Sequence, residues 1–453
     1  MTVADLIKTD QEHLIHSLHD HTEPVIYVRG RGTKIYDADG REYMDGLSGL
    51  WNVNVGHGRA ELAEAAAAQM KELAYCSTYA GSSNIPAITL AGRLSKLSGM
   101  EAVFFTCGGA ESNESAFKTA RFYWKAAGKS GKIKVIARGE AYHGVTLQAM
   151  SATKMGAFWK MFEPRVPGFV HIQTCYPYRF EGAQSGETIG QAAARELEEA
   201  ILHEGPDTVA AFIGEPIHGA GGVIYPDDDY WPRVREICSR HQVLLIGDEV
   251  ITGFGRTGRW FAKDHWAIQP DILTFAKGVT SGYLPLGGMM VSPAIKEALD
   301  SVPPGERWMH AYTYSGHPAC CAVALKNLDI VEQEHLCENA AAMGTRLHAA
   351  LLDAFGDHPY VGDIRGGKGL LAAVELVEDR ASKKNFPGDR KIAARLQSEM
   401  MKRAVVTRTR VAGGPHPAPG DAVYFAPPLV ITETEIDRLV GVCAESLNVV
   451  LRP

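Results

Sequence analysis

Short apolar runs recur along the central part of the chain, and this pattern most limits the folds open to it. Runs of four or five mostly apolar residues stand at 103–106, 134–137, 210–213, 243–246, 272–275 and 287–291. Helical stretches are expected at 60–73 and 86–97, before these runs, and at 111–127, after the first of them. Apolar runs separated by helices are typical of strands buried on both faces of a parallel sheet. The sequence therefore predicts an α/β fold around a buried, largely parallel sheet.

Two charged residues stand where two of these runs end. Asp248 closes the segment that contains 243–246, and Lys277 follows 272–275 at a turn that contains Gly278. Ligands of open α/β sheets bind at the carboxyl ends of strands. Burial favours the neutral amine of a lysine, which can attack an aldehyde, and pyridoxal phosphate (PLP) also needs a carboxylate at its pyridine nitrogen. The pair favours a PLP site, although either residue alone is more often a loop residue or a helix cap.

Two glycine-rich segments add to this hypothesis. Gly108, Gly109 and Ala110 lie between the run 103–106 and the helix expected at 111–127. Such a turn presents free backbone N–H groups and the positive end of the helix dipole, which suit a phosphate. The segment DGLSGLWNVNVGHG at 45–58 carries Trp51 and is either a packing corner or one wall of a site.

Composition excludes several classes of protein. The 453 residues carry 46 basic and 53 acidic side chains, a net charge of −7, without a basic block, which argues against nucleic-acid binding. The eight cysteines are scattered without a C-x-x-C pair, so we expect reduced core residues. No stretch approaches the length of a membrane span, so we expect no membrane partner and a cytoplasmic protein. The mixed spacing of the histidines between 13 and 21 does not favour a metal site, and none is predicted.

The two ends of the chain predict smaller units. Residues 25–46 alternate strand-like runs with turns, which indicates a small antiparallel sheet. A long helix is expected from 318 to about 332, followed by a strand near 369–374 and helices near 390–403 and 433–447. These elements indicate a smaller C-terminal lobe.

Taken together, the motifs resemble those of the class III aminotransferases of PLP fold type I, and most closely the amine:pyruvate (ω-) transaminases. The resemblance covers nearly the whole chain and rests on DGLSGLWNVNVGHGR, FFTCGGAESNE, AYHG, FIGEPIHGAGG, LLIGDEVITGFGRTG, DILTFAKGVTSGYLPLGG, HAYTYSGHPA and FAPPLVIT. It implies a large domain with a mainly parallel seven-stranded sheet and a smaller α+β domain built from both chain ends. The expected boundaries are 1–60 for the N-terminal segment, 61–325 for the PLP-binding domain and 326–453 for the C-terminal part.

The resemblance also implies roles for single residues. Lys277 would form the aldimine with PLP and shuttle a proton during a ping-pong transamination, with Asp248 as the catalytic partner of the pyridine nitrogen. Thr313 would reach the phosphate of the other subunit, so a homodimer, possibly a tetramer, is expected. The residues expected to bind the cofactor are Gly108, Gly109, Ala110, Tyr142, His143, Glu215, Asp248, Val250, Lys277 and Thr313. Those expected to bind substrate are Leu18, Trp51, Tyr142 and Arg408.

Three positions depart from the pattern of the relatives. Many relatives carry Ser where Gly108 and Ala110 stand, so the phosphate turn depends more on backbone amides. His218 stands where relatives carry Gln near the cofactor's hydroxyl. Counting from the preceding helix favours Arg408 as the residue that binds the acceptor's carboxylate, whereas counting from the Gly/Pro loop at 413–420 favours Arg410; we expect Arg408.

The expected substrates are a primary amine, diamine or ω-amino acid and the keto acid pyruvate. The alternative is a 2-oxoglutarate-dependent transaminase of the 4-aminobutyrate or ornithine type. A PLP-fold protein without catalysis is disfavoured because Lys277 and Asp248 are both present. The sequence does not name the amine.

Overall fold

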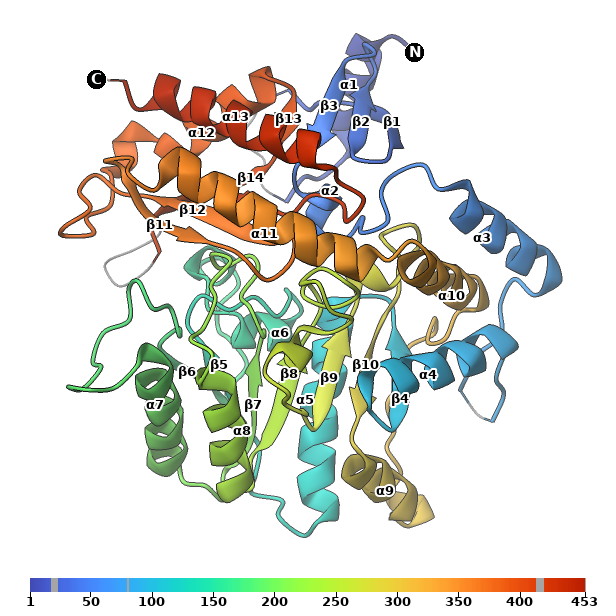
Figure 1. The fold of residues 1–453 in the computed structure, drawn as a ribbon. Helices are drawn as coiled ribbons and strands as arrows, with labels where there is room; N and C mark the ends of the chain where they lie inside the picture. The colour runs from blue at the N-terminus through green and yellow to red at the C-terminus, as the bar shows by residue number, and fades with distance from the viewer. Residues whose placement is uncertain (18–22, 80, 413–418, 453) are drawn as a thin grey trace.

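A computed structural model describes residues 1–17, 23–79, 81–412 and 419–452. Its centre is the seven-stranded sheet that the sequence predicts, here called the large sheet (Figure 1). Its strands, in spatial order, are β4 (Ala102–Thr106), β10 (Gly287–Val291), β9 (Ile272–Phe275), β8 (Leu244–Asp248), β7 (Val209–Gly214), β5 (Lys134–Arg138) and β6 (Phe169–Ile172). Strands β9 to β6 run parallel, whereas β10 is antiparallel to both β9 and β4. The mainly parallel sheet is thus confirmed.

Helices explain why the strands read as unbroken apolar runs. Every residue of β7, β8, β9 and β10 is buried. Helix α5 (Gly109–Ala126) packs along β4, β7, β8, β9 and β10, while α8 (Tyr230–Arg240) packs on β8. The other helices around the large sheet are α3 (Ala60–Glu72), α4 (Ile85–Ser98), α6 (Leu147–Ala152), α7 (Ile189–Glu204) and α9 (Pro293–Ser301).

Both chain ends form smaller sheets on one side of the large sheet, the side on which both termini lie (Figure 1). The N-terminal sheet contains β1 (Tyr27–Arg31), β2 (Lys34–Asp37) and β3 (Glu42–Asp45), and β13 (Val405–Val406) completes it by pairing in parallel with β3. The C-terminal sheet has the order β11 (Val361–Arg365), β12 (Ala372–Leu376), β15 (Asp421–Phe425) and β14 (Arg408–Arg410). The division at residues 60 and 325 stays a prediction.

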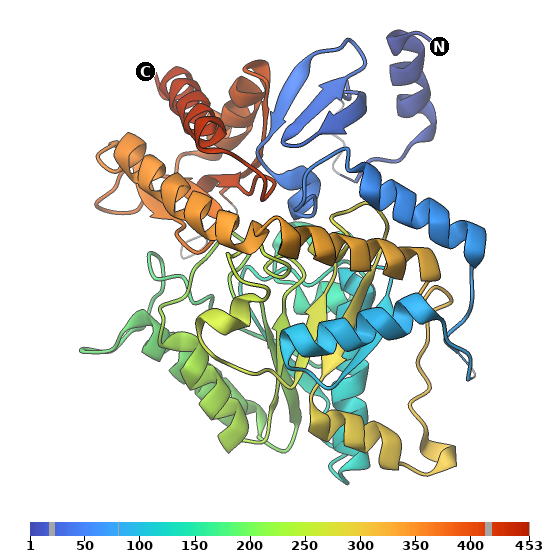
Figure 2. The ribbon, with the colours of Figure 1, turned by 45° about the vertical axis from the view of Figure 1, so that its right-hand side comes forward.

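Long helices join these parts. Figure 2 shows α10 (Pro318–Gln333) and α11 (Leu336–Phe355) crossing the molecule between the large sheet and the smaller ones. Helices α12 (Ile392–Lys402) and α13 (Glu433–Val450) cover the C-terminal sheet, while α1 (Val3–His13) buries none of its residues. All eight cysteines are free, and among the described helices none is long and apolar enough to cross a bilayer.

Element boundaries differ from the prediction in several places. The strand expected near 369–374 begins only at Ala372, because the backbone turns at Gly369, where φ is +66° and a Cβ would clash with Thr257. Strands β6, β11, β14 and β15 were not predicted. They are short, and β6 and β14 each carry charged or imidazole side chains that break an apolar pattern.

Candidate active site

A cavity of about 420 Å³ opens where the strands β4, β5, β7, β8 and β9 end at the same edge of the large sheet. The carboxyl ends of parallel strands lie at the same edge of a sheet, so residues that follow different strands come together there. The cavity is lined by nine of the residues predicted to bind a cofactor, namely Gly108, Gly109, Ala110, Tyr142, His143, Glu215, Asp248, Val250 and Lys277.

Lys277 occupies the turn directly after β9, where its backbone adopts the left-handed conformation with φ +46°. Its side chain faces the cavity. Burial lowers the pKa of Lys277, although the charges of Asp248 and Glu215 oppose this shift. The neutral amine, which is the form that reacts with an aldehyde, is therefore favoured.

Asp248 is the last residue of β8 and is almost fully buried. Its Oδ2 atom accepts hydrogen bonds from His143 Nδ1 (2.7 Å) and Asn113 Nδ2 (2.8 Å), and its Oδ1 atom accepts one from the Val250 N–H (3.0 Å). Burial alone would raise the pKa of Asp248, but the hydrogen bonds and charge of His143 and the amide of Asn113 lower it. The carboxylate thus stays ionised inside the protein.

Sequence reasoning missed Asn113. It lies in the first turns of α5, and its Oδ1 atom accepts a hydrogen bond from the Thr274 hydroxyl (2.8 Å) while its Nδ2 atom donates to Asp248 and to the His143 carbonyl (2.8 Å). A single Asn in a helix forms no pattern. The one available signal was its place three residues after the phosphate turn 108–110, on a helix whose other buried residues are small or apolar.

Glu215, one residue beyond β7, joins two loops at the edge of the cavity. Its Oε1 atom accepts from the Tyr142 N–H (3.1 Å) and its Oε2 atom accepts from the Gly219 N–H (2.8 Å). Burial raises the pKa of Glu215. The carboxylate therefore fixes the loop that carries Tyr142 and His143 against the glycine loop 219–222.

The two candidate arginines have different surroundings. The Arg410 guanidinium donates to Glu140 Oε2 and to the Gly221 carbonyl, both at 2.5 Å. Among the described residues the side chain of Arg408 makes no hydrogen bond or ion pair, and its guanidinium carbon lies 5.6 Å from the centroid of the Trp51 ring. Its charge also acts on Lys277 and Tyr142. The Arg408 side chain therefore lacks the ion pair that occupies Arg410, and its role toward a substrate stays a prediction.

Other predicted residues lie outside the cavity. Trp51 is 2% exposed and packs between Arg408 and Tyr424 rather than lining it. Thr313 is exposed, and its carbonyl accepts from the Tyr75 hydroxyl (2.8 Å). His218 is fully buried and is not among the described residues that line the cavity, so its role near a cofactor stays a prediction. Leu18 lies outside the described residues.

Comparison with known proteins decides the family. The family model described as Aminotransferase class-III matches residues 16–447. The chain belongs to the class III aminotransferases. The crystal structure of a thermostable (S)-enantioselective omega-transaminase from Thermomicrobium roseum is 46% identical to this aminotransferase, with a TM-score of 0.94 and 100% of both chains covered.

Two characterised relatives differ in the keto acid in their names. The diaminobutyrate–2-oxoglutarate transaminase of Halomonas elongata is 39% identical over 99% of this chain and 96% of its own. The putrescine–pyruvate aminotransferase of Pseudomonas aeruginosa is 39% identical over 93% of this chain and 90% of its own. The protein is therefore a PLP-dependent aminotransferase of fold type I, whose acceptor these relatives leave undecided.

The cavity fits PLP. Gly108 is the N-terminal cap of the 18-residue helix α5, so backbone N–H groups and the positive helix end face the cavity beside Gly109 and Ala110. A Cβ on Gly109 would lie 2.9 Å from Val250, which shows how closely these two residues pack. Asp248, with its lowered pKa, and Lys277, whose pKa burial lowers, line the same cavity and supply the two functional groups that the cofactor needs.

Proposed function

We propose that this aminotransferase transfers an amino group from a primary amine, a diamine or an ω-amino acid to pyruvate. The observation that carries the proposal is the placement of Arg408, whose guanidinium has no carboxylate partner among the described residues. Of the described residues that line the cavity, Lys277 alone is a lysine or arginine. One free guanidinium suits an acceptor with a single carboxylate.

The side chains then have distinct tasks. Bound PLP supplies an electron sink for the carbon that carries the amino group. Asp248 holds a proton at the pyridine nitrogen, while Asn113 and His143 keep that carboxylate ionised and oriented. Lys277 Nζ, whose pKa burial lowers, would move the proton of the substrate carbon. Backbone N–H groups of Gly108, Gly109 and Ala110 bind the phosphate, and Val250 and Tyr142 pack on the ring.

The second candidate is transfer to 2-oxoglutarate, as the name of the Halomonas relative suggests. That acceptor carries two carboxylates, and the second requires another cationic partner. Arg408 acts on Lys277 and Tyr142 from outside the described lining of the cavity, and that lining adds no cation besides Lys277, which favours pyruvate.

A panel of amines assayed against pyruvate and against 2-oxoglutarate tests the proposal. We expect turnover with pyruvate for amines that have no carboxylate, and little with 2-oxoglutarate. Faster turnover with 2-oxoglutarate across the panel would contradict the choice of acceptor but not the class of reaction.

We further propose a homodimer, possibly assembled into a tetramer, in a reducing cytoplasm, which the eight free cysteines support. Exposed apolar side chains gather around Thr313: Tyr314 is 57% exposed and contacts Tyr75, while the exposed Tyr79 and Ile88 share a hollow with Trp308. A surface of this kind indicates a protein partner.

Light scattering after size-exclusion chromatography should find a dimer or tetramer. An active monomer would refute the proposed assembly. A mixture of Lys277→Ala and Thr313→Ala subunits should regain activity, since hybrid dimers contain one site with both residues intact.

A further inference from the structure

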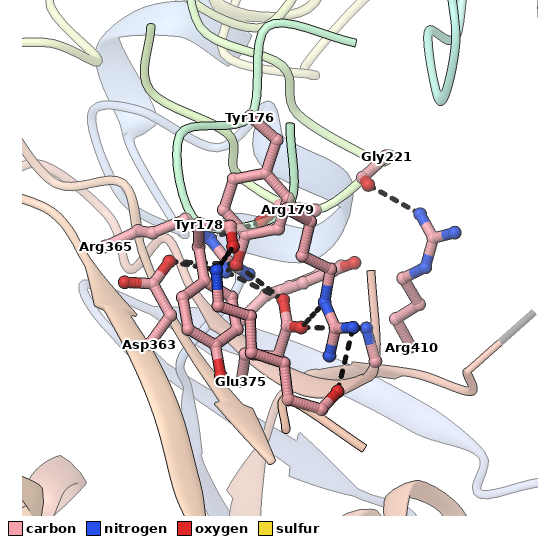
Figure 3. Close-up of polar contacts among 12 residues, drawn as sticks. Tyr176, Tyr178, Arg179, Gly221, Asp363, Arg365, Glu375 and Arg410 are labelled. Atoms are coloured by element: carbon pink, nitrogen blue, oxygen red, sulfur yellow. Dashed lines mark hydrogen bonds and ion pairs between the residues drawn. The ribbon is translucent and has the colours of Figure 1, made fainter. Parts of the chain in front are cut away.

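Arg410 connects the C-terminal sheet to the loops beside the cofactor cavity. Its guanidinium donates to Glu140 Oε2 and to the Gly221 carbonyl, both at 2.5 Å, and Figure 3 shows it extending toward Gly221. The side chains of Arg410 and Glu140 are only 10% and 18% exposed. Little water therefore competes with this charge-assisted pair.

The backbone of the glycine loop 219–222 accepts hydrogen bonds at three successive carbonyls. The Ala220 carbonyl accepts from the Tyr424 hydroxyl (3.4 Å), the Gly221 carbonyl from Arg410, and the Gly222 carbonyl from Arg365 Nε (2.9 Å). The three donors come from β15, β14 and β11, which all belong to the C-terminal sheet. That sheet thus holds the loop along its length.

Arg365 is itself fixed by a buried cluster. Glu375, fully buried in β12, accepts from Arg365 Nη1 (2.9 Å), Arg179 Nε (2.5 Å) and the Tyr176 hydroxyl (2.6 Å) (Figure 3). Arg365 and Tyr424 therefore belong to a rigid part of the sheet. Strand β14 differs, because it is a three-residue edge strand that pairs with β15 alone.

Glu140 belongs to the loop that carries the cofactor-facing residues Tyr142 and His143. Its backbone has φ +60°, and a Cβ on Gly221 would lie 1.7 Å from its carbonyl oxygen, so the Glu140 turn and the glycine loop touch. Glu215 bonds the same two loops at the cavity. Arg410 bonds them on the side of the C-terminal sheet.

Arg408 and Arg410 share one face of β14, because side chains two residues apart on a strand point the same way. The Arg408 guanidinium lies over the Trp51 ring and has no hydrogen bond or ion pair among the described residues, so its position depends on the strand that carries it. The strand has a single neighbour in its sheet. The hydrogen bonds of the Arg410 side chain to Glu140 and Gly221 connect this strand to the two loops at the cavity.

We propose that Arg410 is a positioning residue: by bonding Glu140 and Gly221 it holds β14 against the cavity loops and so sets the reach of Arg408 toward the acceptor's carboxylate. The Arg408 guanidinium stays free to turn, while its backbone does not move. The proposal rests on the role proposed above for Arg408.

The test compares Glu140→Gln and Arg410→Lys with a matched control. Glu140→Gln keeps the shape of the side chain and removes its charge. A lysine at 410 keeps the charge but cannot donate in two fixed directions. The control is Glu187→Gln, because Glu187 pairs with Arg195, which likewise donates to a glycine carbonyl, that of Gly182, away from the cavity.

Three quantities are measured on the cofactor-loaded enzyme. The KM for pyruvate should rise roughly tenfold in Glu140→Gln and less in Arg410→Lys, because a small displacement of a binding group has effects of this order. The half-reaction with an amine that has no carboxylate should keep its rate. Hydrogen exchange of the backbone amides at 405–411 should become roughly tenfold faster in both variants and unchanged in Glu187→Gln.

Arg408→Ala, measured alongside, separates the two proposals. If it leaves the KM for pyruvate unchanged, the role of Arg408 is wrong, whereas faster exchange at 405–411 in Glu140→Gln would still show that Arg410 holds β14. If Arg408→Ala raises the KM but Glu140→Gln and Arg410→Lys change neither KM nor exchange, the positioning role of Arg410 is overturned. Equal changes in Glu187→Gln would overturn that role as well.

Discussion

Replacing Arg408 by Ala gives the sharpest test of how this aminotransferase recognises its acceptor. The guanidinium is partly buried above Trp51 and has no carboxylate partner among the described residues. A carboxylate that enters this region loses its water and needs a charged partner in return. Pyruvate is the substrate that should depend on this residue.

The magnitude follows from the kind of contact. A hydrogen bond between charged groups contributes about 1.5–3 kcal/mol, which corresponds to about ten- to more than a hundredfold in affinity. The wild type gives up the contact with Trp51, worth about 0.5–2 kcal/mol, when pyruvate draws Arg408 away from the ring, so this contact offsets part of the gain from the carboxylate. The KM for pyruvate should therefore rise toward the lower end of that range, by about tenfold.

The assay separates the two half-reactions by stopped-flow absorbance of the bound cofactor. Arg408→Ala should slow the reaction with subsaturating pyruvate by that factor and leave the reaction with a carboxylate-free amine within about twofold. Arg408→Lys is the control that keeps the charge but loses the planar guanidinium. Its rate with subsaturating pyruvate should lie between the rates of the wild type and of Arg408→Ala. Unchanged pyruvate kinetics in Arg408→Ala, or equal losses with pyruvate and with the amine, would refute the reasoning.

Three further variants probe the cofactor contacts. Lys277→Ala should abolish both turnover and the borohydride fixation of cofactor that mass spectrometry detects at residue 277; because burial lowers the pKa of Lys277, fixation in the wild type should begin at a pH below the ordinary range of lysine. Asp248→Asn should slow single-turnover conversion roughly a hundredfold, and an unchanged rate would show that Asp248 is not the partner of the ring nitrogen. Asn113→Ala should cost about 1–3 kcal/mol of unfolding free energy, more than Thr274→Val, which removes only the outer bond of the same chain. Since the pKa of Asp248 is lowered in the folded protein, this group stabilises the fold above the ordinary aspartate range and loses that effect in acid, so the Asn113→Ala deficit should shrink as the pH falls.

The sequence predicted the parts of the site that depend on local pattern. Asp248 and Lys277 end apolar runs, and the edge of a parallel sheet brings such residues together whatever the loops do. Gly108 and Gly109 were found because a strand, a turn and a helix follow one another without interruption. These predictions needed no knowledge of contacts between distant segments.

Contacts between distant segments explain what the sequence did not predict. Asn113 matters because of Asp248 and Thr274, and nothing near it in the chain indicates either. The choice between Arg408 and Arg410 depends on Glu140, 270 residues away, which occupies one arginine and not the other. The role of His218, which its motif places near the cofactor, stays a prediction, because its side chain is fully buried outside the described lining of the cavity.

Trp51 explains how one arginine can serve substrates with and without a carboxylate. A guanidinium over an aromatic face is stabilised by about 0.5–2 kcal/mol, less than or close to the roughly 1.5–3 kcal/mol of a bond to a carboxylate. Pyruvate can therefore draw Arg408 away from the ring, whereas an amine without a carboxylate leaves it resting there at little cost. An arginine with a fixed carboxylate partner, such as Arg410 with Glu140, could not alternate in this way, because leaving that partner would strand a buried charge. The two arginines of β14 thus divide the work between a fixed contact and a movable one.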